Sequence, residues 1–192
     1  MKKFLKVNFF ALIAGLSALT LVACIENDPI EYPPVNVADI PGNYSGKIVI
    51  NHNELNKESL ILHTTTADSI KFAELPLMEI VKSIEPNEVE AADIVKEMGK
   101  VPYGFGYEAK VRQDYGGAEL ILNPQPLELT IPTKAGAKKA IVTFSAKEAG
   151  FYSTTEKAMA IRFKVDEISV DGVKLDPFNA ITYTLPYSTQ TK

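Results

Sequence analysis

The stretch "MAIRFKVDEISVDG", residues 159–172, decides the fold that the sequence predicts. Every second residue from Met159 to Val165 is apolar, which is the period of a half-buried β-strand. The apolar phase then shifts by one position, and this shift predicts a β-bulge at Asp166-Glu167. Asp171-Gly172 follows directly and is a strong signal for a two-residue hairpin turn. The stretch therefore predicts one long, bulged strand that folds back on itself.

Similar alternation covers most of the remaining chain. We expect a polar loop over 51–57 and a hairpin loop at 114–117. About nine strands joined by short turns favour an antiparallel sheet, because parallel strands need long crossover connections. Such a sheet must protect its edges, so we predict a mainly β fold closed into a barrel, with a β-sandwich as the alternative. The other apolar runs lie at 44–50, 60–62, 70–72, 103–111, 118–122, 127–131, 140–144 and 181–185.

Residues 76–99 break the strand pattern and predict a short two-helix insertion. Apolar residues recur there at helical spacing in two groups, one beginning at Leu77 and the other at Ala91. Pro86 separates the groups and Gly99 follows the second, which is the punctuation typical of helix starts and ends. We expect each apolar stripe to pack on the end or flank of the sheet.

The first 23 residues have the plan of a secretory signal peptide. Lys2, Lys3 and Lys6 precede an apolar run over 9–23 that ends in small residues. A helix that spans a membrane needs about 20 residues, so this run is short for that purpose. A short N-terminal anchor helix is the alternative interpretation.

Leu21-Val22-Ala23-Cys24 resembles the lipobox of bacterial lipoproteins. In that family the cysteine thiol receives a diacylglycerol, and cleavage makes the cysteine the new N-terminus. The resemblance implies lipid attachment at Cys24, the one cysteine of the chain, and a membrane as partner through the acyl chains. The acidic residues Glu26 and Asp28 resemble the surface-export signal of Bacteroidota-type lipoproteins, with a solvated acidic tether as the alternative. We therefore expect a protein of the cell envelope, anchored in the outer membrane and exposed on the cell surface.

The charge of the mature chain excludes one class of partner. Removing residues 1–23 leaves 17 basic and 24 acidic residues, a net charge of −7. Such a surface does not favour nucleic acid, whose binding depends on neutralising phosphates with Lys and Arg. Residues 24–38 contain three prolines and predict an extended, lipidated tether. Residues 39–192 have the length of a single β-rich domain.

The run "IPGNYSGKIVI", residues 40–50, resembles the opening strand of calycin-like and lipocalin-like barrels. In lipocalins a Gly-x-Trp motif begins that strand, and its aromatic ring closes one end of the barrel. Gly42-Asn43-Tyr44 occupies the position here, with tyrosine for tryptophan. Over 39–187 the chain also resembles uncharacterised Bacteroidota-type lipoproteins with a calycin-like or lipocalin-like domain. The resemblance implies a calycin-like barrel on a surface lipoprotein, and it implies no reaction.

The residues that could carry chemistry do not form a recognisable catalytic motif. The chain has neither Gly-x-Ser-x-Gly nor His-Glu-x-x-His. His52 and His63 could meet across a hairpin, but no acid or thiol stands at ligand spacing beside both, so we expect neither metal nor cofactor. The acidic residues over 88–97 are interpreted as a solvated helix face rather than the carboxylate pair of a glycosidase. We therefore expect no enzymatic activity.

Two short stretches are candidate sites. Tyr103, Phe105 and Tyr107 alternate with glycine and share one strand face, which can pack in the core, line a ligand cavity, or do both in a barrel. Asp68-Ser69-Ile70 resembles the Asp-Ser/Thr-aliphatic O-glycosylation site of exported Bacteroidota proteins, which makes Ser69 a candidate for modification.

These observations favour a non-catalytic binding module for a small apolar or glycan ligand, with Tyr103, Phe105 and Tyr107 near the ligand. The alternative is a structural or accessory subunit of a cell-surface complex that binds a protein partner without a small ligand. In that case the loops 51–57 and 146–156 would matter more. A hydrolase is the least favoured of the three hypotheses.

Overall fold

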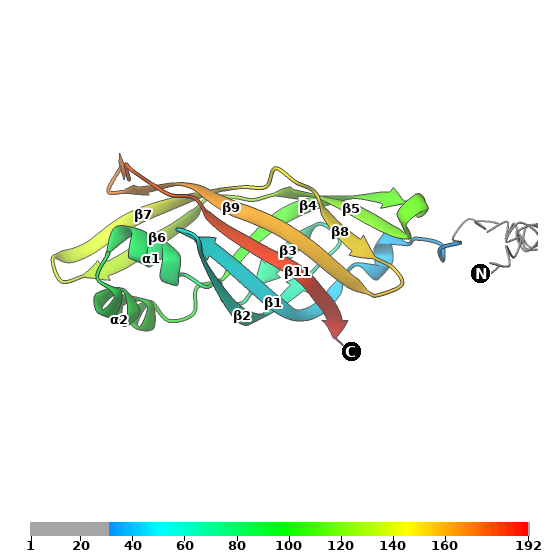
Figure 1. Ribbon diagram of the computed structural model, residues 1–192, viewed down its shortest axis with the longest axis horizontal. Helices are drawn as coiled ribbons and strands as arrows, with labels where there is room; N and C mark the ends of the chain where they lie inside the picture. The colour runs from blue at the N-terminus through cyan, green and yellow to red at the C-terminus, as the bar shows by residue number, and fades with distance from the viewer. Residues whose placement is uncertain (1–30, 192) are drawn as a thin grey trace, which may run out of the picture. The chain divides into compact units, whose positions relative to one another are not determined.

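The computed structural model describes residues 31–191 of the 192-residue chain. This part of the chain is mainly β-structure with two short α-helices, α1 (Met78–Ile84) and α2 (Glu88–Met98) (Figure 1). Two 3₁₀ turns are η1 (Val37–Asp39) and η2 (Gln113–Tyr115). The strands are β1 (Gly42–His52), β2 (Leu55–Thr65), β3 (Ser69–Phe72), β4 (Tyr103–Arg112), β5 (Gly117–Asn123), β6 (Leu127–Thr133), β7 (Gly136–Ser145), β8 (Gly150–Ser153), β9 (Ala158–Val170), β10 (Val173–Lys174) and β11 (Ile181–Thr191).

Within residues 31–191, no helix combines the length and the apolar character that crossing a membrane requires.

Eight of the strands form a closed antiparallel barrel. Their order is β11-β1-β2-β3-β4-β5-β8-β9, and the pairing of β9 with β11 closes the circle. Closure gives each of the eight strands a neighbour on both sides over at least part of its length, which is one of the ways a strand-rich chain protects its edges. The predicted barrel is confirmed. In Figure 1 the helices and the β6–β7 hairpin lie at one end of the barrel, and η2 lies at the other.

β9 has more neighbours than any other strand, and the predicted features of its sequence are confirmed. Its edge opposite β11 pairs first with β8 and then with β7. The register with β7 jumps from Thr143↔Glu167 to Phe144↔Val165, so Asp166 is the extra residue of a β-bulge. Asp171 and Gly172 form the turn to β10, both with positive φ. The bulge lets one strand serve both the barrel and the β6–β7 hairpin.

The connection between β1 and β2 differs from the polar loop expected over 51–57. Asn53 and Glu54 form a two-residue turn with φ of 50° and 65°, and the strands pair right up to it. A turn with positive φ at both central residues fits the twist of the hairpin and fixes its register. As a result His63 faces the interior, opposite Tyr44, while Leu60 and Leu62 point outward and are 80% and 66% exposed.

The two-helix insertion predicted over 76–99 is confirmed. Asn87 caps α2 by accepting hydrogen bonds from the backbone N–H groups of Val89 and Glu90. Gly99 ends α2 with a φ of 65°, a conformation that favours glycine. Ile80 of α1 and Ala91 of α2 are fully buried, so the helices pack their apolar stripes on the domain as expected.

The described part of the predicted tether is attached to the barrel. The backbone N–H of Val35 donates to Gln113 Oε1 at 3.0 Å, and Gln113 Nε2 donates to the carbonyls of Tyr32 and Pro33. Gln113 belongs to η2, so the chain enters the barrel at that end (Figure 1).

Aromatic rings fill the interior of the barrel between the strands. Phe163 stacks on Tyr183 with ring centroids 5.2 Å apart, and Tyr103 lies 4.6 Å from Phe144. Each of five buried tyrosines donates its hydroxyl to a backbone carbonyl outside the strands, which satisfies a polar group that would otherwise cost free energy. The donor and acceptor pairs are Tyr44 and Ile40, Tyr103 and Gln125, Tyr107 and Thr66, Tyr152 and Asp39, and Tyr183 and Pro76.

His63 is a titratable group inside this aromatic interior. Its ring stacks on Tyr44 with centroids 5.2 Å apart, and its Nε2 lies 3.0 Å from Ser188 Oγ. Ser188 faces inward behind an irregularity in β11, where Gly46 of β1 leaves room for it. Burial lowers the pKa of His63 to about 4, because the charged imidazolium loses its hydration there.

We predict that His63 makes folding stability depend on pH between about 6.5 and 4. In this window the unfolded chain binds a proton that the folded chain does not, so the free energy of unfolding falls as the pH falls, by about 3 kcal/mol in total. Urea denaturation at a series of pH values measures this loss.

The matched control for this prediction is the double variant His63→Phe, Ser188→Ala, which removes the imidazole and the hydroxyl bonded to it. Other groups that lose stabilisation in acid are shared by both proteins, so the difference between the two pH curves isolates His63. Equal slopes for the two proteins between pH 6.5 and 4 would contradict the prediction.

Candidate functional site

The three aromatic residues singled out from the sequence lie on the inner face of β4. Tyr103, Phe105 and Tyr107 are 5%, 3% and 7% exposed. Phe105 lies 5.7 Å from Tyr103 and 5.2 Å from Phe163, measured between ring centroids. Burial raises the pKa of Tyr107 to about 12, so its hydroxyl stays a hydrogen-bond donor. The geometry gives these residues a packing role, and their role in ligand binding stays a prediction.

The outer side of the same strand carries a shallow groove of about 420 Å³. Gly104 has no side chain to cover the backbone there, and Lys71 and Ser69 of β3 line the groove beside it. Ser69 is partly buried, and its Oγ lies 2.7 Å from Thr66 Oγ1 in the turn before β3. Modification of Ser69 stays a prediction.

The two histidines lie at opposite ends of the β1–β2 hairpin. His52 pairs with Leu55 beside the turn, whereas His63 pairs with Tyr44 at the far end. They therefore do not converge on one ion. Within residues 31–191, no group of three or more His, Cys, Asp or Glu side chains is arranged to hold a metal.

His52 instead takes part in a polar cluster with the buried Glu79 of α1 and the partly exposed Lys57 of β2. Its Nδ1 lies 2.8 Å from Glu79 Oε2, and Lys57 Nζ lies 2.8 Å from Glu79 Oε1. Burial raises the pKa of Glu79, but the hydrogen bonds from Lys57 and His52 outweigh it and hold that pKa below its usual value. The cluster attaches α1 to the hairpin, which is a structural function.

The acidic residues of the second helix lie on its surface, as the sequence indicated. Glu90 pairs with Lys134 at 2.6 Å, and Glu88 pairs with Lys82 at 3.2 Å. Asp93 and Glu97 line a hollow of about 240 Å³ between α2 and the β6–β7 turn. These carboxylates are at least partly exposed, unlike a catalytic acid with a raised pKa.

A gap in the sheet creates a hollow on the outer wall. β7 and β8 run end to end along the same edge of β9, but residues 146–149 between them leave the sheet. The last pair before the gap is Ser145↔Lys164, and the first after it is Phe151↔Ala160. The outward side chains of β9 opposite this gap therefore lie beneath the connection rather than beside a strand.

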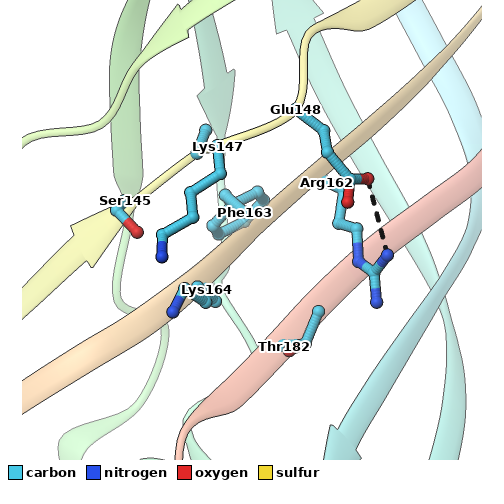
Figure 2. A pocket seen from close by; sticks show the side chains of 8 residues that line it. Ser145, Lys147, Glu148, Arg162, Phe163, Lys164 and Thr182 are labelled. Atoms are coloured by element: carbon cyan, nitrogen blue, oxygen red, sulfur yellow. Dashed lines mark hydrogen bonds and ion pairs between the residues drawn. The ribbon is translucent and has the colours of Figure 1, made fainter.

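We call this hollow the basic pocket. It has a volume of about 190 Å³. Figure 2 shows Lys147 and Lys164 ending on the side of the pocket where Ser145 lies, with Arg162 on the other side. The remaining lining residues are Ala146, Glu148, Phe163 and Thr182.

A second hollow, the aromatic hollow, lies where the same connection enters β8. Its volume is about 460 Å³, and its lining residues are Arg112, Tyr115, Glu119, Ala149, Gly150 and Phe151. Tyr115 is 60% exposed, and the Arg112 guanidinium lies 4.7 Å from the centroid of its ring. Arg112 is held by Asp114 at 3.2 Å. An exposed ring beside a fixed cation and a carboxylate can stack on a ligand and hydrogen bond to it at the same time.

The sequence did not reveal either hollow. Lys147, Arg162 and Thr182 come from three segments that only the register of β7, β9 and β11 brings together. The one available signal was the segment over 146–156, which the sequence predicts to be an exposed loop that would matter in the alternative, accessory role. The short strand β8 lies inside that segment and was not predicted.

Cys24 and the predicted signal peptide lie outside the described residues. The lipid anchor and the location in the outer membrane stay predictions.

Comparison with known proteins places the chain in a family but not in a functional class. Residues 39–170 match the profile of the family described as domain of unknown function, DUF4840. A crystal structure from Bacteroides ovatus, titled as structural genomics of unknown function, is similar over 82% of this chain and 48% of its own chain. It has 10% sequence identity and a TM-score of 0.27. A search of curated proteins gives no match. Because the matching profile covers more than half of the chain, this protein belongs to the DUF4840 family.

Proposed function

We propose that this protein is a lipid-anchored component of the cell envelope whose barrel binds a glycan on its outer wall and does not act on it. The aromatic hollow is the observation that carries the proposal. Tyr115 is 60% exposed, the Arg112 guanidinium lies over one face of its ring, and Glu119 lines the hollow with a carboxylate that can accept hydrogen bonds. A ring flanked by a few fixed polar groups is the usual composition of a site for an amphipathic ligand such as a sugar.

The filled interior supports a site on the outer wall. The rings of Tyr103, Phe105 and Phe163 contact one another across the inside of the barrel. A ligand entering there would have to displace rings whose packing stabilises the fold. The two hollows beside the 146–149 connection are available without such a rearrangement.

The arrangement of carboxylates supports binding rather than hydrolysis. Glycoside hydrolysis uses two carboxyl groups roughly 5 to 9 Å apart, one of them with a raised pKa. Glu79 is the buried carboxylate of the described residues, and Lys57 and His52 hold its pKa below the usual value. It is therefore suited to an ionic contact and not to donating a proton.

The anchoring part of the proposal is supported by the sequence Leu21-Val22-Ala23-Cys24 after an apolar run. Two or three acyl chains hold a protein on a bilayer, whereas one chain is marginal. The acidic residues that follow Cys24 support display on the outer face of the envelope.

A second candidate is the accessory subunit of a surface complex, and one observation favours it. Leu60 and Leu62 on the outer face of β2 are 80% and 66% exposed. β3 pairs only with His63–Thr65 of β2, so residues 55–62 have a strand on one side alone. Exposed leucines beside an unpaired strand edge are features of a protein-binding surface.

We predict that Tyr115→Ala weakens glycan binding at least tenfold, because it removes the stacking surface while leaving the barrel core unchanged. Affinity electrophoresis in gels containing dextran, starch, polygalacturonate or chondroitin sulfate measures the retardation of the protein. The matched control is Tyr187→Ala, which removes another tyrosine that is 50% exposed and lies outside both hollows.

Equal retardation of the two variants would show that the glycan does not bind in the aromatic hollow. Wild-type protein that none of the four polysaccharides retards contradicts the glycan proposal and favours the accessory role.

We also predict that Cys24→Ser releases the protein from membranes, because it removes the thiol to which the acyl chains attach. Phase separation of the cells' detergent extract measures this change. Wild-type protein should enter the detergent phase and the variant the aqueous phase. Wild-type protein that stays in the aqueous phase would contradict the lipid anchor.

A further inference from the structure

We infer that the basic pocket binds the anionic group, a carboxylate or a phosphate, of the ligand that stacks in the aromatic hollow. This inference deepens the proposed function and rests on it. It names the chemical class of the ligand as an acidic saccharide.

Strand register explains why donors gather in the pocket. Lys164 of β9 pairs with Ser145 of β7 on one side and with Thr182 of β11 on the other. Directly paired residues point to the same face of a sheet, so these three side chains form one row across the outer wall. Arg162 lies two residues earlier on the same face, and residues 146–149 bring Lys147 over the row from above.

The charges of the pocket match an anion. Three cations, Lys147, Arg162 and Lys164, face two nearby carboxylates, Glu148 and Asp166, so the site is net positive on a chain with a net charge of −4. Placing like charges close together costs free energy, and an anion bound between them offsets that cost. The hydroxyl of Thr182 adds a donor for its oxygen atoms, while that of Ser145 faces Asp166.

The existing ion pairs leave donors available. Arg162 Nη1 lies 3.5 Å from Glu148 Oε2, with side chains 54% and 70% exposed, and exposed pairs of this kind contribute little stability. Lys164 pairs with Asp166 at 2.6 Å. Lys147 forms no ion pair with a carboxylate in the part of the chain that the structure describes. Lys147 is therefore the cation that an anionic ligand would neutralise first.

The size and place of the pocket limit the ligand. Its volume of about 190 Å³ is below the roughly 300 Å³ at which sites for drug-sized molecules begin. It can take an oxyanion with part of the ring that carries it, but not a whole oligosaccharide. Glu148 lines this pocket and the next residue, Ala149, lines the aromatic hollow, so the two hollows adjoin at this connection, as a ligand that occupies both requires.

Isothermal titration calorimetry of the mature protein tests the inference with three probes: D-galacturonate, the neutral D-galactose, and inorganic phosphate. We expect galacturonate to bind at least tenfold more tightly than galactose, because a charge-assisted hydrogen bond is stronger than a neutral one. Lys147→Gln should weaken galacturonate binding roughly tenfold. Lys139→Gln is the matched control, since it removes an exposed charge of β7 that lies outside the pocket.

The phosphate arm distinguishes the source of the anionic group. Phosphate that competes with galacturonate, and that is also sensitive to Lys147→Gln, shows a general oxyanion site. Phosphate that does not bind while galacturonate does assigns the pocket to carboxylates; the reverse assigns it to phosphorylated sugars.

Two outcomes overturn the inference. In one, galactose binds as tightly as galacturonate; in the other, the Lys147 and Lys139 variants bind galacturonate equally. Either outcome leaves the glycan proposal standing as long as the Tyr115→Ala variant loses retardation by a polysaccharide. If neither sugar binds and no polysaccharide retards the wild-type protein, the proposed function and the inference fail together.

Discussion

The pairing of β9 with two different strands along one edge is the constraint on which the rest of the structure depends. β8 pairs with the beginning of β9 and β7 pairs with its end, both along the same edge. β11 pairs with the opposite edge of β9 and closes the barrel. The bulge at Asp166 turns the far half of β9 out of the barrel toward the β6–β7 hairpin. Because β7 leaves the barrel where β8 enters it, the chain must step off the sheet at 146–149. The outer-wall hollows are a direct consequence of that step.

The same strand also organises the interior. Phe163 lies opposite the gap between β7 and β8, and its ring contacts Tyr103, Phe105, Phe144 and Tyr183. Tyrosine hydroxyls then bind carbonyls of the connecting segments, so the rings hold the loops as well as the core. A barrel packed in this way gains stability from its interior and leaves its outer wall available for the proposed binding. The family is described as a domain of unknown function, and the binding sites proposed for this member lie on the outer surface of the barrel.

The sequence predicted those elements whose signals are local. The bulge at Asp166, the turn at Asp171-Gly172 and the cap at Gly99 each follow from a few neighbouring residues. The orientation of Leu60 and Leu62 could not be predicted, because it depends on the turn at Asn53-Glu54, where both residues have positive φ. The second position of such a turn is usually glycine, and the sequence has Glu54 there. The basic pocket could not be predicted either, because its side chains meet only through the registers of three strands. The ligand chemistry proposed for it therefore rests on the folded structure.

The measurement that tests the central claim most directly is a map of ligand contacts by nuclear magnetic resonance. The backbone amide signals of the mature protein would be followed during titration with a digalacturonate. The account predicts shifts at residues 145–148, 162–164 and 182 and around Tyr115, with the inner residues Tyr103, Phe105 and Tyr107 unchanged. Shifts confined to those inner residues and to His63 would contradict it, because they would place the ligand inside the barrel.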